Sequence, residues 1–216
     1  MVSKGMKVKT VLLFGAPGCG KGTQGKMLGT LPGFFHLACG DVFRALDLSS
    51  DLGKVFLQCS SRGELVPDDV TVQLWREHLN RLIQGGSFKP KTTTLVLDGI
   101  PRNVAQAKIL SDDIDVVKLF LLGVGRKKEV LVQRLKSRAL KDNRLDDANE
   151  ETIRRRLDVY EKESTPVVNF YPQRVRSEVD ALQTPLEVAR DLICEMLGCG
   201  VPERTCCKHR CSRRKK

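Results

Sequence analysis

The sequence predicts an α/β fold, a mostly parallel five-stranded sheet with helices on both faces, and three observations lead to it. Short apolar and β-branched runs, typical of buried parallel strands, alternate with longer segments of helical periodicity. A glycine-rich loop directly follows the first of these runs. The chain has 216 residues, 41% hydrophobic and 29% charged, which is enough for one good core and typical of soluble globular proteins.

The first expected strand and the loop after it form the most specific local pattern. Val8–Phe14 is the strand, and residues 15–23, Gly-Ala-Pro-Gly-Cys-Gly-Lys-Gly-Thr, fit G-x-x-x-x-G-K-[ST]. The backbone N–H groups of such a loop cradle a polyphosphate, and Lys21 reaches its outer phosphates. A helix over Thr23–Thr30 adds a partial positive charge at its amino end. The pattern predicts a nucleotide-phosphate site without saying what happens to the phosphate.

The next segment is expected to hold the second strand and two short helices. Phe34–Leu37 is short enough for a buried strand, and His36 is interpreted as a satisfied core or edge histidine. A helix is expected to start at the glycine turn of Gly40, with Asp41 as its N-cap. Arg44, one turn inside, is either a solvated helix residue or a phosphate ligand. The second short helix spans residues 52–61.

A long amphipathic helix and the third strand follow. The helix runs from about residue 68 to residue 84, and Trp75 is expected in its core face. Thr92–Asp98 is the strand, and it ends in a carboxylate. Because parallel strands bring their carboxyl ends to the edge where phosphate binds, Asp98 is expected near a bound metal. A sharp turn with glycine and proline follows this strand and directs the Arg102 side chain back over the same edge.

Strands and helices alternate again in the last part of the chain. A helix over Glu129–Leu140 places Arg134 and Arg138 on one face, where either a shared anion or solvent accounts for them. The polar segment 141–147 is expected to be a mobile loop. The other expected elements are a strand over 116–122, a helix over 150–159 with three successive arginines, a short helix over 167–171, a strand over 175–179 and a closing helix over 184–197 that Gly198 ends.

Cysteine placement and charge single out the carboxyl tail. Four of the eight cysteines, Cys19, Cys39, Cys59 and Cys194, are interpreted as ordinary thiols. The formal net charge is +11, and seven of these charges lie in residues 204–216. This basic, cysteine-rich tail is expected to be disordered, with contact to nucleic acid or zinc as alternatives. No apolar run approaches the ~20 residues of a membrane helix, so no membrane contact is expected.

Several widely separated motifs together resemble one family. Residues 7–197 resemble the adenylate kinase family of nucleoside monophosphate kinases, in its short-lid form, within the P-loop NTPase superfamily. The motifs that carry the resemblance are residues 15–23, Gly40-Asp41-Val42-Phe43-Arg44, Gly63-Glu64-Leu65-Val66-Pro67, Asp98-Gly99-Ile100-Pro101-Arg102 with Gln106, Arg144-Leu145-Asp146-Asp147, residues 150–157, Tyr160, Thr165-Pro166 and Tyr171.

The resemblance implies a division of the chain into a core and two closing parts. The core comprises residues 1–37, 67–133 and 146–203, an acceptor lobe residues 38–66, and a short lid residues 134–145, ahead of the tail at 204–216. Both parts would close to exclude water. Only five residues separate Arg138 from Arg144 in the lid, so the zinc site of long-lid relatives has no room and no lid zinc is expected.

The resemblance also implies a reaction and its residues: reversible transfer of the γ-phosphoryl group of Mg·ATP to AMP, giving two ADP. Arg138 would flank the ATP adenine and Arg134 a phosphate. The implied catalytic residues are Lys21, Asp98, Arg102, Arg134, Arg138, Arg144 and Arg156. ATP would be bound by Gly18, Cys19, Gly20, Lys21, Gly22, Thr23, Arg134, Arg138 and the Thr184 backbone. AMP would be bound by Cys39, Gly40, Arg44, Glu64, Leu65, Val66, Gly99, Ile100, Pro101, Arg102, Gln106, Arg144 and Arg156. Asp146 and Asp147 would help close the lid, and Thr23 and Asp98 would support Mg²⁺, partly through water.

The acceptor pocket departs from the family pattern at two positions. Gln106 can pair with the N6 and N1 edge of adenine, which favours AMP. Cys39 and Ile100 replace residues usual in the family, and Cys39 is closer in size to the alanine of the pyrimidine branch. UMP, CMP and deoxynucleotides therefore remain alternatives, as does a non-catalytic nucleotide-binding or nucleic-acid-binding module. The resemblance further implies a monomer in the cytoplasm.

Overall fold

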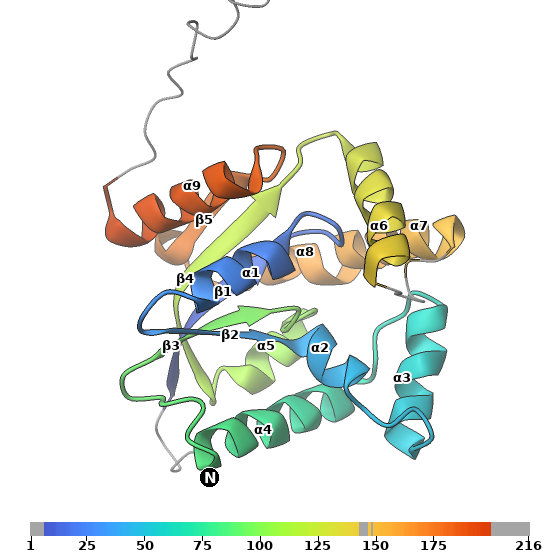
Figure 1. Cartoon of the computed structure of the whole chain (residues 1–216), viewed down its shortest axis with the longest axis horizontal. Coiled ribbons are helices and arrows are strands. Elements are labelled where there is room, and N and C mark those ends of the chain that lie inside the picture. Colours follow the sequence, from blue (N-terminus) through green and yellow to red (C-terminus); the bar gives the residue numbers. More distant parts are fainter. Residues whose placement is uncertain (1–6, 143–146, 148, 200–216) are drawn as a thin grey trace, which may run out of the picture.

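The computed structural model describes residues 7–142, 147 and 149–199, which contain a five-stranded sheet flanked by helices (Figure 1). The strand order is β2-β3-β1-β4-β5, and every neighbouring pair runs parallel. The predicted fold class is therefore confirmed. The strands are β1 (Val8–Phe14), β2 (Phe34–Ala38), β3 (Thr94–Asp98), β4 (Ile114–Gly123) and β5 (Arg176–Asp180).

Helices connect these strands in the predicted order, apart from α5 (Val104–Leu110), which was not predicted. Two of them, α4 and α7, have the predicted bounds. The helices are α1 (Lys21–Gly29), α2 (Cys39–Arg44), α3 (Asp51–Ser61), α4 (Asp68–Gln84), α5 (Val104–Leu110), α6 (Lys128–Asp142), α7 (Glu150–Val159), α8 (Thr165–Phe170) and α9 (Pro185–Leu197). A π-helical turn, Tyr160–Ser164, joins α7 to α8, and a 3-10 turn, Gln173–Val175, precedes β5. Within the described ranges, no helix has both the length and the apolar character of a membrane span.

Each face of the sheet has its own buried cluster, because alternate residues of a strand point to opposite faces. On one face, Leu12 and Phe14 of β1 pack with side chains from α2, α4, α5 and α8. On the other, Val11 and Leu13 pack with side chains from α1, α6, α7 and α9. Trp75 is fully buried in the first cluster, as predicted.

The register of the strands brings three functional segments to one edge. Asp98, the last residue of β3, is paired with Leu13 of β1 and with Ala38 of β2. The glycine-rich loop leaves β1 two residues later, at Gly15, and α2 begins at Cys39, directly after β2. Phosphate loop, strand-terminal carboxylate and the start of the acceptor segment therefore lie side by side at the carboxyl edge.

Three local expectations were wrong. Asp41 does not cap α2: the helix begins at Cys39 with Ala38 at the N-cap, so Asp41 stands inside the first turn and pairs with Arg44. Helix α6 continues to Asp142, into the segment expected to be a loop. His36 is not satisfied, because its buried Nε2 has no hydrogen-bond partner in the described structure.

Candidate active site

A cleft of about 920 Å³ opens at the carboxyl edge of the sheet. Its lining combines the glycine-rich loop, the end of β3 with the turn after it, and one face of α6. The predicted residues that line it are Gly18, Cys19, Gly20, Lys21, Gly22, Thr23, Gly40, Arg44, Glu64, Leu65, Asp98, Gly99, Ile100, Pro101, Arg102, Arg134, Arg138 and Arg156. Residues far apart in sequence thus meet in one place.

The loop between β1 and α1 is shaped by its glycines. Gly15 has φ of 143°, and a Cβ there would stand 2.6 Å from Cys19 Sγ and 2.7 Å from the Leu122 carbonyl oxygen, so no side chain fits. Gly20, at the N-cap of α1, is left-handed, with φ of 107°. The first N–H groups of α1 therefore face the cleft without a capping side chain, as in an anion-binding helix start.

Lys21 is folded back onto the loop that precedes it. Its Nζ donates to the carbonyl oxygen of Gly15 at 2.6 Å and to that of Ala16 at 3.2 Å, and it lies 3.8 Å from Cys19 Sγ. These carbonyls hold the ammonium group over the cradle. The ammonium group therefore lies on the cleft, at the position where such a loop would bind phosphate.

Asp98 and Thr23 form a pair of hard oxygen ligands beside the loop. Asp98 is 8% exposed, and a Cβ on Gly22 would stand 3.7 Å from its Oδ2, so the carboxylate faces the start of α1. Thr23 lies in the first turn of the same helix, on the cleft. Carboxylate, hydroxyl, phosphate and water oxygens are the ligands that Mg²⁺ prefers. The residues present fit this ion.

A smaller cavity of about 60 Å³ adjoins the cleft beneath α2 and α3. Three arginines, Arg44, Arg102 and Arg156, line it together with Cys39 and Gln106, and with Glu64, Leu65 and Val66. Burial raises the pKa of the Cys39 thiol to about 11, so it is neutral at physiological pH.

The turn that carries Arg102 is held from three sides. Arg102 Nε donates to the Gly99 carbonyl oxygen at 2.9 Å, and the Arg102 carbonyl oxygen accepts from Ser164 Oγ at 2.7 Å. The Ile100–Pro101 peptide bond is cis. Gln106 Oε1 accepts from the Arg102 backbone N–H at 2.7 Å. The guanidinium group of Arg102 is therefore presented from a fixed backbone.

One buried carboxylate holds two of the predicted phosphate arginines. The side chain of Asp147 is 0% exposed, and its Oδ2 lies 2.7 Å from Arg138 Nε and 2.6 Å from Arg138 Nη2. Its Oδ1 pairs with Arg156 Nη1. Asp147 itself was predicted for lid closure, whereas in this structure it joins α6 to α7 through these two arginines.

Arg134 and Arg138 do not share one partner, although they lie one turn apart on α6. Arg134 Nη1 donates to the carbonyl oxygen of Ala181, in the segment between β5 and α9. Arg138 turns to Asp147 instead. The two arginines therefore contact different segments of the chain.

The segment before α9 is built around a helix cap. The Thr184 side chain accepts from the Glu187 backbone N–H, and Glu187 Oε2 accepts from the Thr184 N–H at 2.9 Å, which makes a capping box. Gln183 and Pro185 line the cleft on either side of Thr184. The amide of Gln24, which also lines the cleft, donates to the Pro185 carbonyl oxygen at 2.9 Å.

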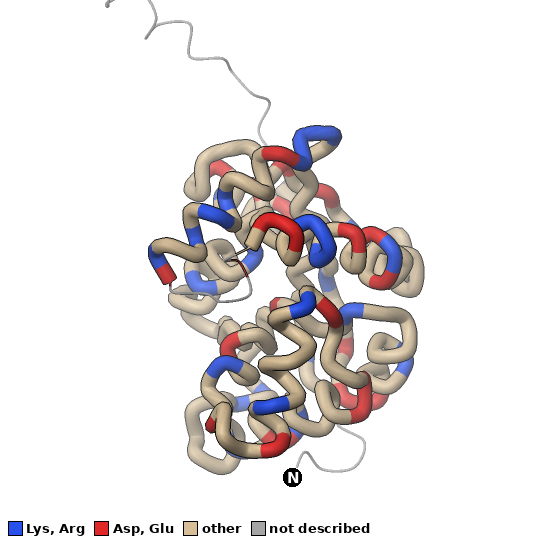
Figure 2. Tube along the Cα trace, turned by 90° about the vertical axis from the view of Figure 1, so that its right-hand side faces the viewer, with Lys and Arg blue, Asp and Glu red and all other residues tan. Residues whose placement is uncertain are grey.

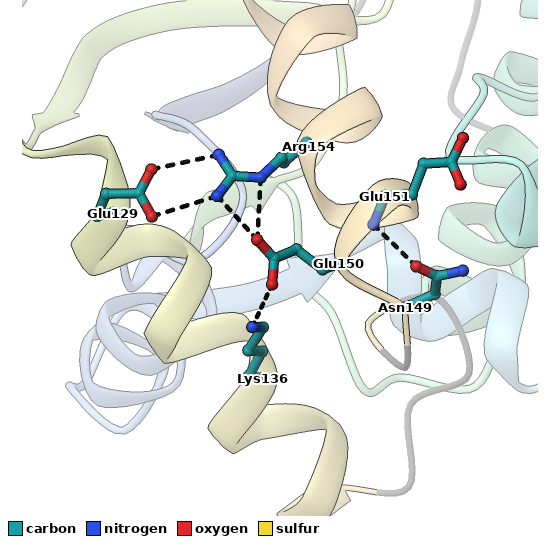
Figure 3. Close-up of polar contacts among 6 residues, drawn as sticks. All are labelled: Glu129, Lys136, Asn149, Glu150, Glu151 and Arg154. Atoms are coloured by element: carbon teal, nitrogen blue, oxygen red, sulfur yellow. Dashed lines mark hydrogen bonds and ion pairs between the residues drawn. The ribbon is translucent and has the colours of Figure 1, made fainter.

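Exposed ion pairs connect α6 and α7 (Figure 3). Arg154 contacts Glu129 at 3.2 Å and Glu150 at 2.8 Å, and Glu150 also pairs with Lys136. Hydrogen bonds from Lys136 and Arg154 hold the pKa of the Glu150 carboxyl below its usual value. Because all four groups are exposed, each pair contributes little to stability on its own.

Charged residues of both signs occur on the described part of the chain. Figure 2 shows basic and acidic residues interspersed along the described chain. In the part of the chain that the structure describes, no group of three or more His, Cys, Asp or Glu side chains is arranged to hold a metal ion. Arg144, Asp146 and the tail at 204–216 lie outside the described residues.

Sequence reasoning missed residues that act through others. Asp68 Oδ1 accepts from Gln106 Nε2, and Asn103 Oδ1 accepts from the Gln106 backbone N–H as the N-cap of α5, each at 2.8 Å. Arg155 pairs with Glu64 at 2.5 Å and links α7 to the segment after α3. No local signal marks Asp68 or Arg155, since their partners lie 38 and 91 residues away in sequence.

Comparisons with known proteins agree with this arrangement. The family model described as adenylate kinase matches residues 13–176. The chain is 38% identical to an adenylate kinase of Thermobifida fusca over 185 residues, which covers 83% of this chain and 94% of the relative. It is 39% identical to one of Thermus thermophilus, covering 83% and 92%, and 32% identical to one of Corynebacterium urealyticum, covering 86% and 98%. Matched over most of its length by the family model and by these relatives, the chain belongs to the adenylate kinase family.

Proposed function

We propose that the protein catalyses reversible transfer of the γ-phosphoryl group of ATP to AMP, giving two ADP. The observation that carries this proposal is a single cleft lined both by a phosphate loop and by arginines from four other segments. Hydrolysis of a nucleotide needs only one phosphate site. Basic side chains placed for a second anion support transfer between two nucleotides, and the printed name of the relatives agrees with it.

The donor triphosphate would lie over the loop and the amino end of α1. Lys21 would exchange the carbonyl oxygens of Gly15 and Ala16 for phosphate oxygens. The contact of Arg134 with Ala181 supports placing Arg134 beside the donor base, and the position of Arg138 near Arg156 supports placing it on phosphate. This assignment exchanges the two roles that the resemblance implied. Thr184 would contribute backbone only, since its side chain caps α9.

The acceptor phosphate would lie among Arg44, Arg102 and Arg156 at the smaller cavity. Two unit negative charges ~4 Å apart repel by ~4 kcal/mol at an effective dielectric constant near 20, so arginines are needed to bring donor and acceptor together. Phosphoryl transfer requires in-line placement and neutralised oxygens, with little covalent work by the protein. Arg144, outside the described residues, is proposed to join this set.

Thr23 and Asp98 would hold Mg²⁺, partly through water. When bound, the ion neutralises oxygens of the donor phosphates. Asp98 contributes a carboxylate that the strand end fixes, and Thr23 contributes a hydroxyl from the first turn of α1. Both side chains lie on the cleft wall formed by the phosphate loop.

Closure of the acceptor lobe (38–66) and the short lid (134–145) is proposed to exclude water, which would otherwise accept the phosphoryl group. The Arg155–Glu64 pair supports contact between α7 and the acceptor lobe. We further propose a monomeric, cytoplasmic enzyme. The buried free thiols of Cys19 and Cys39 are typical of a reducing compartment.

Coupled measurement of ADP formation with AMP, UMP, CMP and GMP as acceptors tests the proposal. We expect turnover with AMP at the highest kcat/KM. Turnover that prefers UMP or CMP would reject AMP as the acceptor, and no turnover with any acceptor would reject the kinase and favour a nucleotide-binding module.

Lys21→Met tests the role of the phosphate loop in the same assay. Removing the ammonium group that meets the transferring phosphate should lower kcat by about 100-fold or more. Lys9→Met is the matched control, because Lys9 is exposed in β1 away from the cleft and should leave kcat unchanged. Near-normal turnover by Lys21→Met would refute the assigned role.

A further inference from the structure

A network of buried amides and one carboxylate surrounds the inner end of the acceptor cavity. Gln106 is 1% exposed and lines the cavity. Its Nε2 donates to Asp68 Oδ1 at 2.8 Å, and its Oε1 accepts from the Arg102 N–H at 2.7 Å. Asp68, in the first turn of α4, also accepts two contacts from Asn103 Nδ2, at 2.8 and 3.0 Å.

This network allows the Gln106 amide one orientation. If the amide were flipped, Oε1 would face the Asp68 carboxylate, which only accepts, and Nε2 would face the Arg102 N–H, which only donates. Both contacts would become repulsive, and buried polar groups would lose their partners. Asp68 and the Arg102 backbone therefore determine which end of the amide is the donor.

The orientation limits which base edge can pair with Gln106. Each end atom of the amide keeps one hydrogen-bonding position, an N–H on Nε2 and a lone pair on Oε1. A 6-aminopurine presents an acceptor at N1 and a donor at N6, whereas a 6-oxopurine presents the reverse order. A site with fixed polar groups rejects an edge that leaves them unpaired much more strongly than an apolar pocket does.

We propose that Asp68 is a positioning residue that makes the acceptor site specific for 6-amino bases over 6-oxo bases by holding the Gln106 amide in one orientation. The inference rests on the proposed function, since it takes the small cavity as the acceptor site. Asp68 is not among the residues that line the cavity in the described structure, so it acts through Gln106. Asp68 discriminates without touching the substrate.

AMP and IMP are the sharpest pair of acceptors, because they differ only in the group at position 6 and in the hydrogen at N1. In Asp68→Asn, the new amide can accept from Nε2 or donate to Oε1, so the Arg102 N–H is the one described contact that still opposes the flipped orientation of Gln106. We expect the ratio of kcat/KM for IMP to kcat/KM for AMP to rise at least tenfold. The KM for ATP should not change.

Two control variants distinguish a loss of the Gln106 orientation from general damage to the acceptor site. Asp69→Asn alters the neighbouring exposed carboxylate in the same helix turn and should leave the ratio unchanged. Asn103→Ser removes the Asn103–Asp68 contacts but keeps the Asp68–Gln106 contact and a hydroxyl to cap α5, and it should also leave the ratio unchanged. Should Asp68→Asn fail to fold, Asp68→Ser removes the same carboxylate and is measured in its place.

The outcomes distinguish this inference from the function on which it rests. An unchanged IMP-to-AMP ratio in folded Asp68 variants, with AMP turnover intact in the unaltered enzyme, overturns the role of Asp68 alone. An unaltered enzyme that transfers no phosphoryl group to AMP overturns the proposed function and this inference together. An equal rise of the ratio in Asn103→Ser also contradicts the proposal, because that variant keeps the orienting contact.

Discussion

At the scale of single residues, individual side chains hold the charged groups of the site in place. Asp147 is the clearest case, because one buried carboxylate contacts the guanidinium groups of Arg138 and Arg156 from two helices. Without it, two neighbouring guanidinium groups would lose their shared counter-charge. Arg102 and Gln106 are fixed in a comparable way by neighbouring backbone and amide groups. These contacts hold Arg102, Arg138 and Arg156 in place within the described structure.

Asp147→Asn should destabilise the fold and weaken phosphate binding. Removing one partner of a fully buried ion pair costs about 3–5 kcal/mol, and we expect about 2 kcal/mol here because both guanidinium groups reach solvent. Urea unfolding measures this free energy. Asp158→Asn, an exposed carboxylate on α7, is the control and should change it by less than about 0.5 kcal/mol. Equal effects of the two variants would contradict the role given to Asp147.

His36 should make the fold less stable in mild acid. Burial lowers its pKa, although the negative charges of Asp98 and Asp41 oppose this, and Lys26 adds to it. Below its usual pKa of about 6.5 the unfolded chain binds a proton that the folded chain excludes, so stability falls as pH falls until the lowered folded pKa is reached.

Urea unfolding of the unaltered protein and of His36→Leu, between about pH 7.5 and about pH 5.5, measures this effect. The variant should lose less stability over the window, since leucine does not titrate. Parallel pH profiles of the two proteins would show that His36 binds its proton equally in both states.

At the scale of helices and strands, the helix starts determine which backbone N–H groups are open to a ligand. The uncapped start of α1 leaves N–H groups for phosphate, whereas α9 uses its own capping box next to the cleft. The first is open to a ligand and the second is closed by Thr184 and Glu187. The start of α1 is thus available for binding, whereas the start of α9 contributes to stability, and both border the cleft.

Thr184→Ala should affect stability and spare ATP binding. Loss of an N-cap hydroxyl costs about 1 kcal/mol, measured by urea unfolding, while the backbone proposed to contact the donor base remains. The KM for ATP should stay within a factor of two or so of the original, as for other changes outside a site. Leu186→Ala, an exposed residue in the same turn, is the control and should change neither quantity. A large rise in the KM for ATP would assign the side chain to the donor site.

Apart from α5, the order and type of the helices and strands could be predicted from the sequence, because the periodicity of apolar residues is local. The bounds of α7 and the position of Asp98 at the end of β3 followed from it directly. The start of α2 did not, since Ala38 carries no capping group, and the end of α6 did not, since Lys141 and Asp142 suit an exposed helix as well as a loop. The partners of Arg134, Arg138 and Gln106 depend on packing between distant elements, so no local pattern could reveal them.

At the scale of the whole molecule, the topology of the sheet brings the proposed donor and acceptor segments together. Parallel strands in the order β2-β3-β1-β4-β5 place the phosphate loop in the centre, with the acceptor segments beside β2 and β3 and the donor-base segment beyond β5 (Figure 1). Ion pairs join α6 to α7 (Figure 3). This arrangement fits transfer between two bound nucleotides better than hydrolysis of one.

The destination of the γ-phosphoryl group tests this central claim most directly. ATP labelled in its γ-phosphate is incubated with the protein and Mg²⁺, with and without AMP, and the products are separated. The account predicts that the label appears in the β-phosphate of ADP formed from AMP, with little free phosphate in either reaction. Label released as free phosphate at the same rate whether or not AMP is present would contradict it.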